Sequence, residues 1–490
     1  MSLEKLVEIV HTLGTDSWSD RNKEAFASLF GAPSGRYPKA AEKVTALRAP
    51  GMTSEESISF AAYIHVDNPK SGPYSGLSFV IFPVDDGPCL VGLVVGTQGL
   101  APDEAILGRP GHARKTRAIA DWLNKDHGNG KRIAWAKHDP TRTDISVPEE
   151  LQKEWNAYAA VFKRYGREMY ALFVPNENRE ITRVAIAALL DLMMEERSIT
   201  TIASATQDAD AIRASWFAQL MPQTAQRQVR DLLSDRGFVI LQGPPGTGKT
   251  RMATALLRED YAGRGQTIQF HPNTSYENFI GGLAPVQAAD ALGLQFRPTP
   301  GFLMQAVRLA QSDPQSFFLL HIDEINRADL GKVLGEAILL LEWNSDTQRS
   351  VSLPYDFGEP FGNKLSLPKN LHILGTMNTA DRSIAIVDVA VRRRFGFLSV
   401  WPDSSVVEQH ACTLMQKAFR DILSIFVEYA GEDAFQLIPG HAYFLAADDA
   451  SARQSLKVNL APLLEEYLSQ GFVGGFAEPI RSFLQWLRSL

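Results

Sequence analysis

Cysteine is almost absent from this chain of 490 residues, which has only Cys89 and Cys412. The two lie far apart in the sequence, and neither has histidines at the spacing of metal ligands. This scarcity argues against a disulfide framework and against a structural zinc site. A cytoplasmic location is the default expectation for such a chain.

Long apolar runs are missing as well, because no stretch approaches the roughly 18 apolar residues that span a bilayer. Near the start of the sequence, apolar residues from Leu3 to Leu13 fall on one helical face, but Glu4, Lys5 and Glu8 interrupt them. This pattern predicts a packed first helix rather than a signal peptide. We therefore expect no membrane association.

Several catalytic patterns are also lacking. No Ser–His–Asp or Cys–His arrangement has a supporting sequence context, and the carboxylates and lysines form no metal-dependent nuclease motif on adjacent strands. We therefore expect any DNA cleavage to belong to another chain.

The composition is that of a chain with room for two or three domains, since it is 45% hydrophobic and 21% charged over 490 residues. Up to about residue 200, short β-rich runs are separated by Gly, Pro and Asp turns and flanked by helical stretches. The strands are expected at 57–65, 77–83 and 89–95, and the helices at 113–124, 149–165 and 180–197. This region is predicted to be an independent α+β module, residues 1–200.

Beyond the polar stretch 198–210, strands and helices alternate, which is typical of a parallel sheet covered on both faces. We predict a doubly wound parallel sheet over residues 212–402, with the turn-rich segment 350–368 inserted as a β-hairpin. A helical lid is predicted over residues 403–490.

A phosphate-binding loop is indicated where a short apolar strand, 238–241, runs directly into a glycine-rich segment and then a helical stretch, 251–258. The segment consists of Gly243, Pro244, Pro245, Gly246, Thr247, Gly248, Lys249 and Thr250. Glycines allow backbone N–H groups to face phosphate oxygens, and the helix N-terminus adds partial positive charge. We predict that Lys249 reaches the β- and γ-phosphates and that the Thr250 hydroxyl binds Mg²⁺. A chance glycine-rich turn is the alternative, which the flanking strand and helix disfavour.

Two carboxylates follow a second apolar run, 317–322, which is typical of a buried parallel strand. Asp323 is expected to hold Mg²⁺ through water, and Glu324 to polarise the attacking water. The simpler alternative is that the pair caps the next helix.

A third predicted strand, 371–376, leads to Asn378, where an amide orients water or contacts the γ-phosphate. The alternative for a loop asparagine is a turn former. A helix predicted over 387–395 ends in Arg392, Arg393 and Arg394. Three arginines in one turn are either a solvated helix end or, in a ring-shaped ATPase, groups that reach the γ-phosphate of a neighbouring subunit.

In their order, the segments GPPGTGKT, IQFHPNTSYENFIGG, HIDEINRADLGKVLGEAILLLE, LGTMNTADRSIAIVDVAVRRRF and IPGHAYF resemble the McrB family of AAA+ GTPases. The resemblance covers about residues 212–445, and MNTADRS is its most discriminating part. It implies a subunit of a type IV, modification-dependent restriction system that acts in antiviral defence. It also implies GTP as substrate, Mg²⁺, a hexameric ring, and a McrC-like partner that brings the nuclease.

The resemblance also carries residue roles. Lys249 and Thr250 match the phosphate-loop pair, and Asp323 and Glu324 match the Walker B pair. Asn378 and the nucleotide-binding Asp381 match the signature that replaces the usual sensor segment. Arg393 and Arg394 match the family's arginines, one of which acts in trans. GTP rests on the resemblance alone, and ATP is the alternative substrate.

The N-terminal module is then expected to choose the DNA target. Residues 109–167 contain 13 Lys and Arg against 7 Asp and Glu, a balance of 13 − 7 = +6 in a chain of net charge −7. This permits phosphate contact, and aromatic side chains would hold a flipped base. The candidate residues for contact with DNA are Trp122, Trp135, Trp155, Arg109, His112, Arg114, Lys115, Arg117, Lys131 and Arg132. The alternative is that the tryptophans are core residues and the basic residues form a solvated face.

Two other functions compete with this interpretation. One is an ATP-dependent chaperone or remodeller of protein complexes of the MoxR type, and the other is a scaffold that binds nucleotide without hydrolysing it. The intact pair Asp323 and Glu324 argues against the scaffold.

Overall fold

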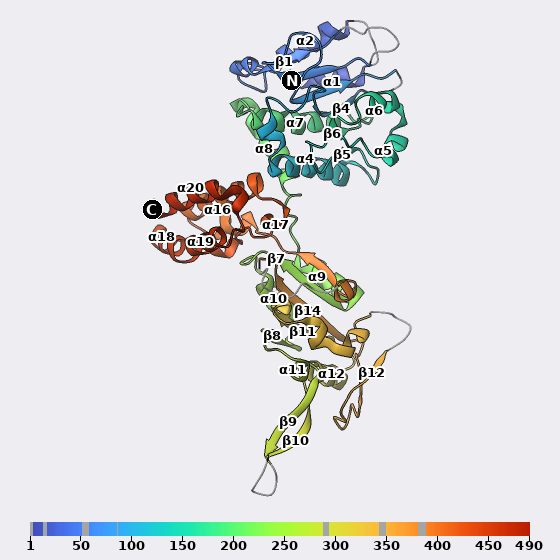
Figure 1. The fold of residues 1–490 in the computed structure, drawn as a ribbon, viewed down its shortest axis with the longest axis vertical. Coiled ribbons are helices and arrows are strands. Elements are labelled where there is room, and N and C mark those ends of the chain that lie inside the picture. Colours follow the sequence, from blue (N-terminus) through green and yellow to red (C-terminus); the bar gives the residue numbers. More distant parts are fainter. Residues whose placement is uncertain are drawn as a thin grey trace. The chain divides into compact units, whose positions relative to one another are not determined.

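The computed structural model describes residues 3–12, 17–50, 58–85, 87–287, 294–342, 349–380 and 389–490. The chain forms two compact units (Figure 1). Unit 1 consists of Met1–Met221 with Val427–Ala430, and unit 2 of Pro222–Phe426 with Gly431–Leu490. None of the described helices is long and apolar enough to cross a membrane.

Unit 1 is an α+β module built on one antiparallel sheet of order β1-β2-β3-β4-β6-β5. Its strands are β1 (Thr45–Arg48), β2 (Ala61–His65), β3 (Leu77–Phe82), β4 (Leu90–Val95), β5 (Ala134–Ala136) and β6 (Met169–Phe173). Its helices are α1 (Glu4–His11), α2 (Trp18–Ser28), α3 (Glu104–Leu107), α4 (Pro110–Trp122), α5 (Glu149–Glu154), α6 (Ala159–Tyr165), α7 (Arg179–Glu196) and α8 (Ala203–Phe217). Every residue of β3 and β4 is buried, so both faces of the sheet centre are covered. The predicted α+β class is confirmed.

Unit 2 contains a parallel sheet of order β15-β7-β14-β11-β8. Its strands are β7 (Phe238–Gly243), β8 (Gly265–Gln269), β11 (Phe318–Asp323), β14 (Leu371–Asn378) and β15 (Gly396–Ser399). The helices around it are α9 (Gln226–Arg236), α10 (Lys249–Glu259), α11 (Tyr276–Phe279), α12 (Phe302–Ser312), α13 (Leu330–Leu334) and α14 (Val389–Arg392).

Alternation along β7 explains why helices cover both faces of this sheet. Phe238 and Ile240 join one buried cluster, to which α12 contributes, whereas Val239 and Leu241 join another with α9 and α10. Successive side chains of a strand point to opposite faces, so an all-apolar strand requires two covering layers. The predicted doubly wound parallel sheet is confirmed.

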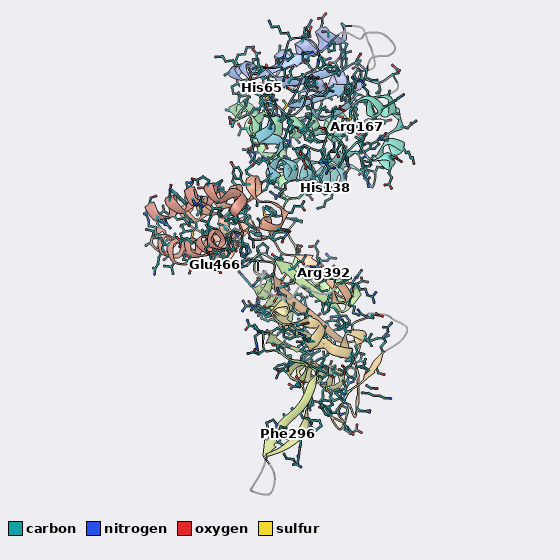
Figure 2. All side chains as sticks on the ribbon, viewed as in Figure 1. His65, His138, Arg167, Phe296, Arg392 and Glu466 are labelled. Carbon is teal, nitrogen blue, oxygen red and sulfur yellow. The ribbon has the colours of Figure 1, made fainter. Side chains whose placement is uncertain are left out.

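Two hairpins are attached to this core. The predicted hairpin in 350–368 consists of β12 (Ser350–Ser352) and β13 (Lys364–Ser366), which pair antiparallel. A second hairpin, β9 (Gly281–Gln287) with β10 (Leu294–Pro300), extends away from the sheet and was not predicted (Figure 1). Its Phe296, labelled in Figure 2, is 61% exposed.

The segment after the sheet is helical, as expected for a lid. It contains α15 (Ser404–His410), α16 (Thr413–Tyr429), α17 (Glu432–Phe435), α18 (Asp449–Ser455), α19 (Ala461–Ser469) and α20 (Ala477–Ser489). Between α17 and α18, a short turn of helix over His441–Phe444 lies against the loop that follows β7.

Candidate active site

Parallel pairing brings the predicted site residues to one edge of the sheet. Strands β7, β14 and β11 are neighbours that run in the same direction, so their carboxyl ends meet. In this register Asn378 lies opposite Gly243, the first residue of the glycine-rich loop. Asp323 is the last residue of β11, on the other side of β14 from β7.

The loop turns sharply before α10 because two of its glycines have a left-handed backbone. Gly246 has φ of 76° and Gly248 of 83°, a region that favours glycine. The Thr247 hydroxyl donates to the carbonyl of Pro244 over 3.0 Å and closes the turn.

The buried side chain of Lys249 folds back onto this loop. Its Nζ donates to the carbonyl oxygens of Gly243 at 3.0 Å and Pro244 at 2.6 Å. Burial lowers the pKa of Lys249 to about 8, although Asp323 and Glu324 partly oppose the shift. The ammonium group is therefore bound by neutral acceptors, which anionic phosphate oxygens would replace with a stronger interaction.

The Thr250 hydroxyl donates to Oδ1 of Asp323 over 2.9 Å, which directly joins the loop to the strand end 73 residues later. The Thr376 hydroxyl donates to the same oxygen, and its Oγ1 accepts from the backbone N–H of Glu324 at 3.3 Å. A hydroxyl and a carboxylate at one point are the oxygen ligands that Mg²⁺ prefers, so these residues fit the predicted metal. Thr376 was missed, although its place near the end of β14 was a usable signal.

Glu324 lies in the left-handed region with φ of 51°, which is costly for a residue with a side chain and concentrates at functional sites. Its carboxylate forms an ion pair with Nε of Arg327 at 2.6 Å and accepts from Nε2 of Gln269 at 3.1 Å. Arg327 and Gln269 were not predicted as site residues, and spacing alone did not identify them.

The remaining predicted residues differ in where they lie. The carbonyl of Asn378 accepts from Nδ2 of Asn326 at 3.2 Å, which ties the end of β14 to the turn after β11. Asp381 lies outside the described residues.

The two candidate arginines are not equivalent. Arg394 has a side chain that is 7% exposed, lies 3.2 Å from Glu342 and donates to the carbonyl of Ala390. Arg393 has a side chain that is 71% exposed and lies 4.0 Å from Glu342. Of the two, Arg393 is therefore the one that a neighbouring molecule can reach.

Five of the ten residues proposed for DNA contact in the N-terminal module are buried. Trp122 and Trp155 are buried, as are His112, Arg114 and Lys115. Nζ of Lys115 lies 2.7 Å from the buried carboxylate of Glu196. The interpretation of these five side chains as DNA contacts is wrong, because all five are buried: four lie on helix α4, and Trp155 follows α5. The basic balance of a segment does not report which of its charges are exposed.

An aromatic cavity of about 180 Å³ instead opens elsewhere in the same module. It is lined by Phe60, Tyr74, Phe82 and Tyr165, with Arg164 and Glu168 also in its wall. The guanidinium of Arg164 lies 5.0 Å from the centre of the Tyr165 ring. This cavity contains none of the three tryptophans that were considered.

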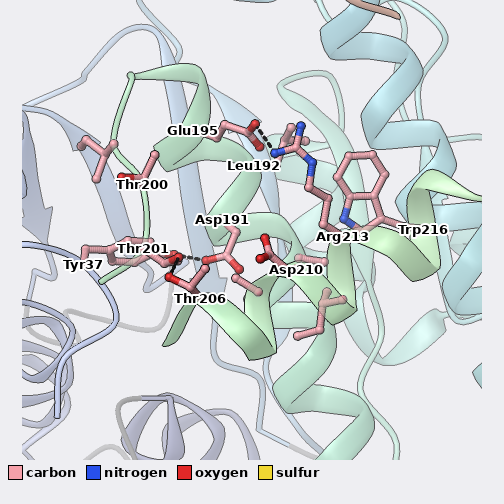
Figure 3. Close-up of a pocket in the computed structure, with 14 residues that line it drawn as sticks. Tyr37, Asp191, Leu192, Glu195, Thr200, Thr201, Thr206, Asp210, Arg213 and Trp216 are labelled. Carbon is pink, nitrogen blue, oxygen red and sulfur yellow. Dashed lines mark hydrogen bonds and ion pairs between the residues drawn. The ribbon is translucent and has the colours of Figure 1, made fainter. Parts of the chain in front are cut away.

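A larger cavity of about 360 Å³ lies between α7 and α8 (Figure 3). Two of the three carboxylates in its wall have internal partners, since Asp191 accepts from Tyr37 at 2.7 Å and Glu195 pairs with Arg213 at 2.6 Å (Figure 3). Asp191 is also paired with the buried Arg36. The pair of Glu195 with Arg213 joins α7 to α8.

Comparisons with known proteins agree with this geometry. Residues 238–395 match the family "AAA domain (dynein-related subfamily)". The chain is 30% identical over 366 residues to the type IV methyl-directed restriction enzyme EcoKMcrB subunit of Escherichia coli K12, covering 67% of this chain and 77% of that protein. It is 26% identical over 229 residues to the type II restriction enzyme BsuMI component YdiS of Bacillus subtilis 168, covering 38% and 66%. A putative ATPase from Cytophaga hutchinsonii gives a TM-score of 0.24 at 13% identity, covering 42% of this chain and 65% of that one, which is too low to bear on the fold.

Proposed function

This chain belongs to the family of the McrB subunit of type IV restriction enzymes, and we propose that it is the GTP-hydrolysing motor of such a system. The nucleoside triphosphatase class follows from the AAA domain and the family. GTP, the DNA target and the nuclease partner are the parts that we propose.

The observation that carries the proposal is the hydrogen bond between Thr250 and Asp323 at the edge where Lys249 also lies. In this mechanism Lys249 leaves the loop carbonyls and binds the β- and γ-phosphates. Thr250 and Asp323 would hold Mg²⁺, which when bound neutralises charge on the phosphates. Gly246, Gly248 and their neighbours in 243–250 present backbone N–H groups to the same oxygens.

Glu324 is proposed as the general base that activates the attacking water. The carboxylate accepts a proton from the water while the water oxygen bonds to the γ-phosphorus. The bond from that phosphorus to the β,γ-bridging oxygen breaks, which releases GDP and phosphate, and Asn378 orients the water from the neighbouring strand end. In the described structure Glu324 is paired with Arg327, so the carboxylate must exchange this partner for the water. Asp381 completes the nucleotide site by its match to the family signature.

Arg393 supports a ring in which subunits complete each other's sites. An exposed arginine next to a buried one is suited to reach the γ-phosphate held by a neighbour and to stabilise transition-state charge. We propose a hexameric ring with Arg393 acting in trans and Arg394 positioning it.

The N-terminal module is proposed to bind DNA through exposed basic residues, with a modified base held in the aromatic cavity. The exposed cationic residues nearest that role are Lys131, Arg132, Lys163, Arg164 and Arg167, the last of which is labelled in Figure 2. Four aromatic side chains provide stacking faces, and the carboxylate of Glu168 can accept a hydrogen bond from an exocyclic amine. A separate McrC-like nuclease would then cut the DNA.

The decisive experiment is a turnover assay with GTP and ATP in parallel, with Mg²⁺, and with and without the nuclease encoded beside this chain. We expect GTP hydrolysis that the nuclease stimulates and that Lys249→Ala abolishes by weakening nucleotide binding. A preference for ATP together with no salt-dependent binding to modified or plain DNA would instead indicate the MoxR-type remodeller.

A further inference from the structure

A short segment of the lid lies directly on the phosphate loop. The N–H of Gly440 donates to the carbonyl of Pro245 at 2.9 Å, and the N–H of Ala442 to the carbonyl of Gly246 at 3.0 Å. A Cβ on Gly440 would lie only 2.1 Å from the carbonyl carbon of Gly246, so glycine is required by space at this point. The residue between these two contacts, His441, is therefore held beside the loop.

The imidazole of His441 has a defined orientation. Its Nδ1 accepts a hydrogen bond from the backbone N–H of Asp403 at 3.1 Å. Because Nδ1 is the acceptor, the proton of the neutral ring is on Nε2. Burial, and to a smaller degree Arg251, lower the pKa of His441 while Asp403 opposes them, which favours this neutral form.

The donor atom of this ring faces the loop. Nε2 lies 3.5 Å from the position that a Cβ on Gly248 would occupy. Among the residues that the structure describes, none accepts a hydrogen bond from Nε2. Gly248 directly precedes Lys249 and the N-terminus of α10, where the oxygens of a bound phosphate chain gather. A phosphate oxygen is the acceptor that this position offers.

We infer that His441 is a nucleotide-binding residue of the lid, whose Nε2–H donates to a phosphate oxygen of the nucleotide on loop 243–250. This rests on the proposed function, since it requires nucleotide at that loop. The lid contacts the loop through these backbone hydrogen bonds and would contact bound nucleotide through His441. Occupancy of the site is thereby transmitted to the helices of the lid.

Three substitutions separate this role from a structural one. His441→Gln places an amide N–H where Nε2 lies, His441→Asn places an acceptor where Nδ1 lies, and His441→Ala removes both. We expect His441→Gln to bind GDP and a non-hydrolysable GTP analogue within about threefold of the wild type. His441→Asn and His441→Ala should weaken binding about 10- to 100-fold, the cost of a lost hydrogen bond to a charged group.

The opposite order would overturn the inference. If His441 serves only to hold Asp403, then His441→Asn retains affinity and His441→Gln loses it. His410→Ala, an exposed histidine at the end of α15, is the matched control and should bind as the wild type does. Melting temperatures without nucleotide identify any variant whose defect is in folding.

Two further arms make the result specific. Competition with inorganic pyrophosphate should show the same loss as GDP; a loss confined to GDP would place the acceptor on the ribose or base and overturn the phosphate assignment. Lys249→Ala tests the parent proposal separately. If the wild type binds no nucleotide, the proposed function fails. If the wild type binds nucleotide, Lys249→Ala does not bind it, and all His441 variants bind as the wild type does, then only this inference fails.

Discussion

Two buried lysines, one in each unit, have opposite kinds of partner. In unit 2, Lys249 donates to neutral carbonyl oxygens of its own loop, and burial lowers its pKa to about 8. In unit 1, Lys115 pairs with Glu196. Burial alone would raise the pKa of Glu196, but His112 and Lys115 outweigh it and lower that pKa to about 2. The charge of Lys249, which has no carboxylate partner, is available to an anionic ligand. The charge of Lys115, which is compensated by Glu196, stabilises the fold.

The largest effect that would sharpen this comparison is expected at Glu324. Glu324→Gln removes the proton acceptor without changing the shape of the site, so turnover should fall by up to about 10⁴-fold while nucleotide affinity is retained. Steady-state hydrolysis and equilibrium binding are the two measurements. The matched control is Glu259→Gln at the exposed end of α10, which should leave both unchanged. Normal turnover in Glu324→Gln would contradict its assignment as the base.

The second prediction concerns two neighbouring arginines, one available to a ligand and one bound inside the fold. Arg393→Ala should lower turnover about 10²- to 10³-fold, as expected when a donor to transition-state charge is lost, with an unchanged melting temperature. Arg394→Ala should lower the melting temperature, because its nearly buried guanidinium binds Glu342 and the carbonyl of Ala390. Mixing Arg393→Ala with Lys249→Ala subunits should restore part of the activity if Arg393 acts in trans. A loss of stability in Arg393→Ala would reverse the two roles.

The same contrast explains what could be predicted from the sequence. In unit 2 the phosphate loop, the pair Asp323 and Glu324, and Asn378 were each predicted after an apolar strand, and parallel pairing of β7, β14 and β11 brings those strand ends together. Asp323 therefore met Thr250 as expected. In unit 1 the prediction used residue types alone, and Arg114 or Lys115 carry no sequence signal that they are buried.

Other parts of the site depend on tertiary contacts between distant segments. Gln269, at the end of β8, reaches Glu324 across 55 positions, and the lid residue His441 reaches Gly248 across almost 200 positions of sequence. Neither spacing nor periodicity contains that information. The protruding hairpin β9 and β10 was missed because its strands, rich in Gly and Pro, lack the usual β-rich composition.

The third prediction tests unit 1. Lys115→Ala leaves the carboxylate of Glu196 buried with less compensation, which should lower the free energy of unfolding by about 3 kcal/mol, roughly a hundredfold in the folding equilibrium. Salt-dependent DNA binding by the folded protein should be unchanged. Lys163→Ala, which removes an exposed charge, should do the reverse, with little loss of stability and weaker DNA binding. Denaturant unfolding and salt titrations of DNA affinity are the measurements, and weakened DNA binding by folded Lys115→Ala would remove the contrast between the two lysines.

The smallest effect concerns pH, and its sign follows from the lowered pKa of Lys249. Phosphate binds the ammonium form of Lys249, whose pKa without nucleotide is about 8. When the pH is above this value, Lys249 must therefore take up a proton as nucleotide binds. Affinity should therefore be constant below pH 8 and weaken as pH rises, by at most about tenfold per pH unit. Nucleotide affinity measured between pH 7 and pH 9.5 checks this, and Lys249→Arg, which stays charged throughout, should bind with a flat profile. Equal slopes in the two proteins would assign the titration to another group and would leave Lys249 no different from a lysine with a permanent carboxylate partner.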